Sequence, residues 1–94
     1  MKTKILDWAE PKGLLNPDFA PKQFIKLSEE VGELANAILK ENKEEQKDAL
    51  GDIRIVVRIL ANQLGFDIDD CEESAYQVIK NRKGVTKNGT FIKD

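Results

Sequence analysis

The chain has 94 residues, of which 40% are hydrophobic and 34% charged, a composition typical of one small domain with a wet surface. Its formal net charge of -2 argues against a general affinity for nucleic acid or anionic membrane, which would need a basic excess. The sequence contains no histidine, which removes the most common general base and the most common zinc ligand. Any chemistry must therefore rest on carboxylates, lysines, arginines or a metal ion held by oxygen.

The cysteine count and the apolar runs indicate the cellular compartment. Cys71 is the only cysteine, so the chain cannot form an internal disulfide. No apolar run is long enough for a signal peptide or a membrane span. We therefore expect a cytoplasmic protein.

The first 20 residues are expected to be mostly turn and loop, with a short helical piece around Leu6 and Trp8. A long helix is predicted to start between Asp18 and Pro21 and to end near Glu41, because proline suits a first helical turn. Residues 41–43 are predicted to form a turn.

Two more helices follow in the prediction. One runs over about 43–64 and stops at Gly65, a residue typical of helix C-terminal caps. The other starts after Phe66, with Asp67 or Asp69 as its cap, and continues to about residue 83. The tail after Gly84 contains Asn88-Gly89 between β-favouring pieces, which predicts a small hairpin or an extended arm.

The pattern therefore predicts an all-α single domain over 1–94. It comprises an N-terminal segment (1–20), a helical core (21–83) and a C-terminal tail (84–94). We expect an antiparallel bundle of three to four helices with a short C-terminal extended arm. Because the 43–64 helix is apolar around most of its circumference, oligomerisation is expected to complete the bundle.

The first long helix carries two stripes. Its expected core stripe is apolar: Phe24, Leu27, Val31, Leu34, Ala35 and Ile38. A second line of residues, also three and four apart, runs beside it: Gln23, Lys26, Glu30, Glu33 and Ala37. Glu30 and Glu33 are one turn apart, so their carboxylates repel each other. A divalent cation between them would attract both. The alternative is a solvated acidic patch.

The next helix places acids among apolar residues. Asp48 and Asp52 share one face, which continues into apolar positions rather than into the polar strip of Arg54 and Arg58. We therefore expect both aspartates to point inward, where carboxylates are normally paired or bound to metal. The alternatives are an ion pair with another helix, or a helix-start role for Asp48.

The two acidic pairs would have to meet. A short turn makes the two helices antiparallel neighbours, but the pairs need not be level, so a slant between the helices would have to close the gap. If it does, three or four carboxylates surround one cavity, which suits Mg²⁺ or Mn²⁺.

These residues also resemble a known family. The run from Ser28 to Ala35 (SEEVGELA), followed by Asp48 to Asp52 (DALGD), resembles the Glu-Glu-x-x-Glu and Glu-x-x-Asp motifs of the MazG-like nucleotide pyrophosphohydrolases. The resemblance covers most of the chain and looks closest to the short, single-domain members. Further positions carry it: Gln23, Lys26, Tyr76, the run 80–84 and the run 88–93.

The resemblance implies an all-α fold and a Mg²⁺ site with Glu30, Glu33 and Asp52 as ligands. One position departs from the family pattern, because Ala49 stands where the family has glutamate. Asp48, one residue earlier and on the same side of the helix as Asp52, is the candidate substitute.

The reaction that the resemblance implies is hydrolysis of a nucleoside triphosphate between the α- and β-phosphates. Glu29 or another carboxylate would orient or deprotonate the water. Substrate contacts are expected at several matching positions: Gln23, Lys26, Tyr76, Asn81, Arg82 and Lys83. For the basic residues, the alternative is that they only stabilise the end of a helix, where positive charge interacts favourably with the helix dipole. Trp8, Phe24 and Tyr76 are candidates to stack on a base, with core packing as the alternative.

The expected partners are the nucleotide and further copies of the chain, as a homodimer or homotetramer, with no membrane or nucleic acid. A non-catalytic helical partner or regulatory protein is the alternative function. Nucleic-acid binding is a weaker one, supported only by the basic residues between Lys80 and Lys87.

Overall fold

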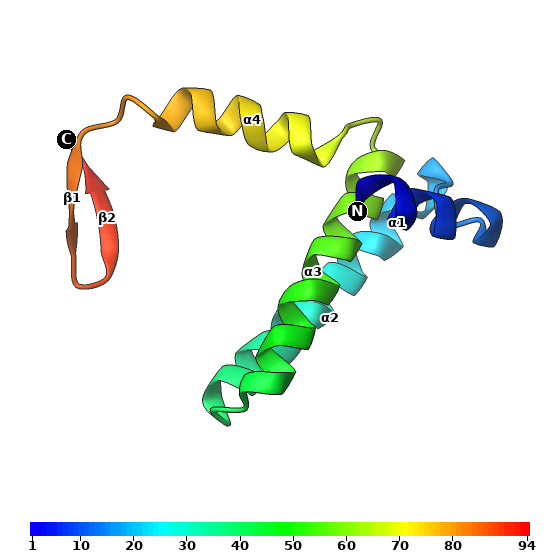
Figure 1. The fold of residues 1–94 in the computed structure, drawn as a ribbon, viewed down its shortest axis with the longest axis horizontal. Helices are drawn as coiled ribbons and strands as arrows, with labels where there is room; N and C mark the ends of the chain where they lie inside the picture. Colours follow the sequence, from blue (N-terminus) through cyan, green and yellow to red (C-terminus); the bar gives the residue numbers. More distant parts are fainter.

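The computed structural model describes all 94 residues as four helices, two short 3-10 turns and one C-terminal hairpin (Figure 1). In chain order the helices and strands are α1 (Lys2–Ala9), α2 (Ala20–Leu39), α3 (Lys43–Gln63), α4 (Ile68–Ile79), β1 (Gly84–Lys87) and β2 (Thr90–Lys93). The 3-10 turns, Glu10–Lys12 and Pro17–Phe19, lie between α1 and α2. The prediction of an all-α fold is confirmed.

The centre of the fold is an antiparallel pair formed by α2 and α3. The turn between them reverses the chain at Glu41, whose φ is 56°, and Asn42 then caps α3 by accepting a hydrogen bond from the backbone N–H of Glu45 at 3.0 Å. Two hydrogen bonds cross between the helices. Gln46 Nε2 donates to the carbonyl of Ala37 at 3.3 Å, and Gln23 Nε2 donates to that of Val56 at 3.5 Å. They fix the register of α2 on α3 at both ends of the pair.

The N-terminal segment folds across the end of this pair that lies away from the turn. The side chain of Asn16 caps the 3-10 turn Pro17–Phe19, and Pro21 lies in the first turn of α2, as the sequence predicts. Gln63 Nε2 donates to the carbonyl of Leu14 at 2.7 Å, which ties the loop after α1 to the end of α3.

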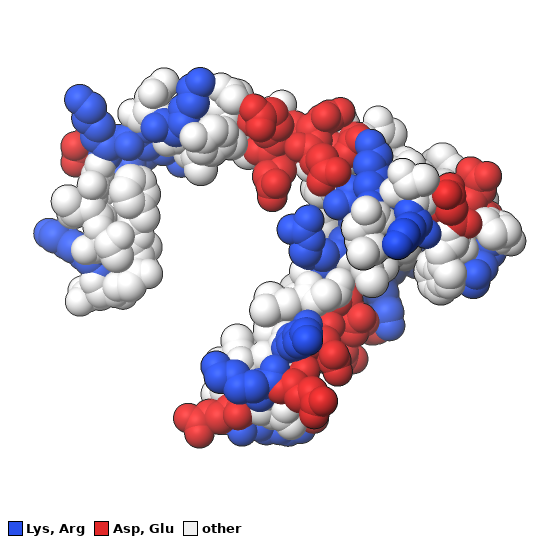
Figure 2. Space-filling model, viewed as in Figure 1, with Lys and Arg blue, Asp and Glu red and all other residues white.

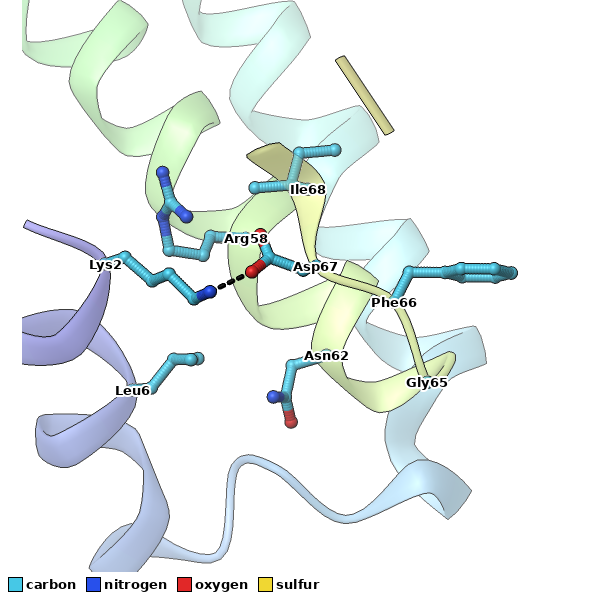
Figure 3. Close-up of a pocket in the computed structure, with 8 residues that line it drawn as sticks. All are labelled: Lys2, Leu6, Arg58, Asn62, Gly65, Phe66, Asp67 and Ile68. Carbon is cyan, nitrogen blue, oxygen red and sulfur yellow. Dashed lines mark hydrogen bonds and ion pairs between the residues drawn. The ribbon is translucent and has the colours of Figure 1, made fainter. Parts of the chain in front are cut away.

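A cavity of about 330 Å³ lies where α1, the end of α3 and the start of α4 meet (Figure 3). Lys2 reaches across it to form an ion pair with Asp67, which is also the N-cap of α4. Beside it, Arg58 donates two hydrogen bonds of 3.2 Å to the Asp69 carboxylate. These contacts join α1 to the start of α4, and α4 to α3.

The C-terminal third of the chain forms an arm. The left-handed Gly65, with a φ of 88°, ends α3, and α4 then leads away from the α2–α3 pair (Figure 1). This helix ends at Ile79, several residues before the predicted end near residue 83, and β1 and β2 pair as an antiparallel hairpin through the Asn88-Gly89 turn. Within one chain α4 packs only on α3, and the hairpin packs on no other element.

The expected core stripe of α2 is confirmed only in part for the single chain. Leu27 and Leu34 are half-buried, whereas Phe24, Val31 and Ile38 are 59%, 50% and 55% exposed. Of the second line, Glu30 and Ala37 are 5% and 1% exposed, but Lys26 and Glu33 are exposed. The physical reason is that α3 is the only long helix beside α2, so it covers a single face of α2, and that face takes residues from both stripes.

Two predicted orientations on α3 are also corrected. Asp48 and Asp52 are exposed to solvent, although they stand beside α2. Arg58, expected on a polar strip, is only 7% exposed, because α4 and its Asp69 cover that side.

The core is small for the length of the chain. Only 10 of 94 residues are buried, and the radius of gyration is 15.9 Å. A compact domain of this length has a radius of gyration of about 12 Å. None of the helices is long and apolar enough to cross a membrane.

Candidate functional site

An acidic pocket of about 240 Å³ lies between α2 and α3, near the turn that joins them. Its lining residues come from one turn of α2 and two turns of α3: Glu33, Asn36, Glu45, Asp48, Ala49 and Asp52. Three of the four predicted acidic ligands, Glu33, Asp48 and Asp52, line this pocket, whereas Glu30 does not. Because the turn is short, Glu33 and Asp48 stand at similar heights, between the Gln46–Ala37 and Gln23–Val56 hydrogen bonds.

Glu30 lies one turn further along α2, on the same strip as Glu33. Its Oε1 forms an ion pair with Lys26 Nζ at 3.3 Å, and its side chain is 7% exposed. The other oxygen, Oε2, is buried and has no hydrogen-bond partner. A buried carboxylate oxygen without a donor is unfavourable, and it is the kind of atom that a cation satisfies.

The carboxylates influence one another. The pKa of Glu33 is raised chiefly by the nearby Glu30 carboxylate, to which a protonated Glu33 could donate and whose charge repels an ionised Glu33, with smaller contributions from burial and from the charge of Asp52. The pKa of Lys26 is raised by its hydrogen bond to Glu30, by the charge of Glu30 and, to a lesser extent, by the charges of Glu29 and Glu33. Glu30, Glu33 and Asp52 are therefore close enough to share one electrostatic environment.

The donor set fits a hard divalent cation. All the nearby charged acceptors are carboxylate oxygens, which Mg²⁺ and Mn²⁺ prefer, and one of them is buried and unpaired. As the side chains stand, no group of three acidic residues is gathered closely enough to hold a metal ion. The role of Glu30, Glu33, Asp48 and Asp52 as ligands therefore stays a prediction.

Two further predicted residues lie along the same strip of α2. Gln23 is half-buried and hydrogen-bonded to α3, and Lys26 is held beside Glu30. Glu29 is exposed and lines none of the pockets described here. Asn36 and Glu45 were not predicted. Glu45 lies in the first turn of α3, so its spacing from Asp48 and Asp52 is the signal that would have found it.

The predicted residues of the C-terminal part are not brought to this pocket within one chain. Tyr76 is exposed on α4, and Asn81, Arg82 and Lys83 are exposed between α4 and the hairpin. Figure 2 shows acidic residues over the first half of α4 and basic residues around its end, away from the α2–α3 pair.

An apolar pocket of about 490 Å³ lies between the N-terminal segment, α2 and α3. Trp8, Leu14, Ile55, Ile59 and Gln63 are among its lining residues, and Gln23 and Lys26 also line it. Trp8 was one of the three predicted base-stacking aromatics, whereas Phe24 and Tyr76 line neither pocket. Gln63 and Leu14 were not predicted, because their pairing depends on a contact between distant parts of the chain.

Fold and pocket together define a small all-α protein with an acidic pocket between two antiparallel helices. The profile of the family described as the MazG nucleotide pyrophosphohydrolase domain matches residues 22–85, which include all of α3 and all but the first two residues of α2. The chain belongs to this family.

One relative is an uncharacterized 18.2 kDa protein from the rep-hol intergenic region of Haemophilus phage HP1, 43% identical over 63 residues. The match covers 67% of this chain but only 39% of the relative, so the chain corresponds to about two fifths of that protein. No solved structure gives a significant match.

Proposed function

We propose that the protein is a Mg²⁺-dependent nucleoside triphosphate pyrophosphohydrolase, which adds water between the α- and β-phosphates to give a nucleoside monophosphate and pyrophosphate. The observation that carries the proposal is the acidic pocket between α2 and α3, within the segment matched by the family profile. An acidic pocket without a cation would repel a triphosphate, so this substrate requires a bound metal ion.

Glu30, Glu33 and Asp52 would hold the cation, with Asp48 as a further or water-mediated ligand. A divalent cation at this position supplies neutralisation of phosphate charge and activation of water. In the absence of histidine, a carboxylate that does not hold the cation would accept the proton of the attacking water, and Glu29, next to Glu30 in the sequence, is the candidate. Lys26 holds one oxygen of Glu30 and leaves the other free for the cation.

The active protein is proposed to be a homodimer or homotetramer. The apolar face of α2 and most of α4 are uncovered in one chain, and a second copy is the simplest cover for both. In such an assembly Arg82 and Lys83 of one copy would be free to contact phosphates held by another, because they lie far from the acidic pocket of their own chain.

The test is a panel of ribo- and deoxynucleoside triphosphates with Mg²⁺, in which pyrophosphate and orthophosphate are assayed separately. Pyrophosphate release that is abolished by EDTA supports the proposal. Orthophosphate release would indicate another class of phosphohydrolase.

The alternative is a non-catalytic helical partner protein, and the large uncovered apolar surface is the observation that favours it. Absence of turnover with every nucleotide, in a protein that is folded and oligomeric, would favour this alternative.

A further inference from the structure

Glu30 is the one predicted ligand that does not line the acidic pocket. The other three do: Glu33, Asp48 and Asp52. The side chain of Glu30 is only 7% exposed, its Oε1 contacts Lys26 Nζ at 3.3 Å, and its Oε2 is buried. The carboxylate is therefore directed to Lys26, and a cation in the pocket could reach it only after the side chain had turned.

The turn that Glu30 needs is small. Glu30 and Glu33 are neighbours on one strip of α2. The Glu30 carboxylate is also the main cause of the raised pKa of Glu33, which places the two carboxylates close together. Because Glu33 lines the pocket, Glu30 lies next to the pocket wall. A change of side-chain rotamer, without movement of α2, would bring its carboxylate to a cation held by Glu33 and Asp52.

The ion pair that holds Glu30 is a weak one. Lys26 precedes Glu30 by four residues, which is the less favourable order of the two charges along a helix. The lysine side chain is 52% exposed, so water screens its charge. A divalent cation carries twice the charge of the ammonium group and would lie among the further carboxylates of the pocket. The cation is therefore expected to compete successfully for Glu30.

We propose that Lys26 is a positioning residue, which holds Glu30 away from the acidic pocket until a divalent cation binds there. The cation then takes the Glu30 carboxylate and releases the ammonium group. Release leaves Lys26 free for a phosphate of the substrate, so this inference deepens the proposed function and rests on it. Because the lysine competes with the cation, its removal should make cation binding tighter rather than weaker.

Titration calorimetry with Mg²⁺ measures this competition without any turnover. Lys26→Met keeps a long apolar side chain but removes the ammonium group. It is expected to tighten Mg²⁺ binding about threefold or more, which corresponds to the free energy of an exposed ion pair. Unchanged or weaker binding by Lys26→Met would overturn the proposal.

The matched control is Lys22→Met, one turn earlier on the same helix. It removes the same charge, but Lys22 forms no ion pair with a carboxylate. The control separates loss of the Glu30 contact from a general loss of positive charge near the pocket. Its Mg²⁺ affinity is expected to stay within about 1.5-fold of the wild-type value. An equal gain of affinity in both variants would overturn the role of the Lys26–Glu30 contact.

Release of the lysine is measured on the wild-type protein, so this second test does not depend on how well a variant folds. Amine acetylation followed by mass spectrometry gives the reactivity of each lysine, and a lysine paired with a carboxylate reacts more slowly than a free one. Lys26 is expected to react about threefold faster or more with saturating Mg²⁺ than with EDTA, whereas Lys22 should not change. Asp52→Asn should remove the response of Lys26 at the same Mg²⁺ concentration. Equal reactivity of wild-type Lys26 with and without Mg²⁺ would overturn the proposal.

The exchange at Glu30 and the proposed reaction can fail separately. Mg²⁺-dependent pyrophosphate release, without any effect of Mg²⁺ on Lys26, would overturn the exchange and support the reaction. Release of Lys26 by Mg²⁺, without turnover of any nucleoside triphosphate, would support the exchange and overturn the reaction.

Discussion

Lys26 and Glu30 lie one helical turn apart on α2 and are joined by an ion pair of 3.3 Å, but the pair satisfies only half of the glutamate. Glu30 Oε1 faces the ammonium group, whereas Oε2 is buried without a partner. The lysine is half-exposed and stays in contact with water, so the unfavourable burial falls on the carboxylate. This arrangement lowers the stability of the metal-free protein. A cation bound at Glu30 would remove the unfavourable term and raise the stability again.

This relationship predicts opposite effects of one substitution on stability and on metal binding. Glu30→Met replaces the unsatisfied carboxylate with an apolar side chain of similar size, and is expected to raise the melting temperature of the metal-free protein by about 4 °C or more. The same change should abolish the increase in melting temperature that Mg²⁺ causes in the wild type. Thermal unfolding with EDTA and with Mg²⁺ measures both effects. A large loss of metal-free stability would show that Glu30 is satisfied in the folded protein.

Helical spacing predicts which acidic residues share a face of one helix, but it does not predict how those faces pack. Spacing along each helix placed Glu30 with Glu33 and Asp48 with Asp52, since helical periodicity is a local property. It did not show that Glu30 would be buried, because burial depends on which stripe of α2 meets α3. The apolar stripe is the expected core, yet the single chain leaves Phe24 and Val31 exposed.

The apolar pocket shows the same limit. Trp8 was a candidate on residue type alone, but the Gln63–Leu14 hydrogen bond joins residues far apart in the sequence. No periodicity within α3 distinguishes Gln63 from an exposed glutamine. Its burial depends on the contact between the loop after α1 and the end of α3.

Asp48 is predicted to replace the family glutamate that is missing at Ala49. Both residues line the acidic pocket with Asp52, so either position can present a carboxylate there. Asp48→Asn should weaken Mg²⁺ binding, but by less than Asp52→Asn does. The double change Asp48→Ala with Ala49→Glu should recover part of the loss. Titration calorimetry with Mg²⁺ measures each affinity, and equal values for wild type and Asp48→Asn would exclude Asp48 as a ligand.

The uncovered face of α2 predicts self-association. Light scattering at micromolar concentration should give the mass of a dimer or tetramer, and Val31→Glu should shift it toward the monomer by placing a charge in the apolar contact. Lys47→Glu is the control, because it changes charge at an exposed position of α3 without altering an apolar face. A monomeric wild type would contradict the proposed assembly.

The contact between Arg58 and Asp69 predicts a dependence of stability on pH. The hydrogen bonds from Arg58 lower the pKa of Asp69 in the folded protein. The pair therefore stabilises the fold above the unfolded pKa of about 3.9, and this contribution is lost as the pH falls through the lower, folded pKa. Asp69→Asn should melt at a lower temperature than wild type at pH 7, and the difference should shrink below pH 4. A difference that is independent of pH would show that the charge of Asp69 is unimportant.

The most direct test of the central claim follows the products of one nucleoside triphosphate by ³¹P NMR, with Mg²⁺ and then with excess EDTA. The account predicts nucleoside monophosphate and pyrophosphate in equal amounts, no orthophosphate, and no reaction after chelation. Glu33→Gln and Asp52→Asn should each slow the reaction by about 100-fold or more while keeping the helical fold. Glu44→Gln, on α3 but outside the pocket, should react at the wild-type rate. Orthophosphate as the product, or near-normal turnover by Glu33→Gln, would contradict the account.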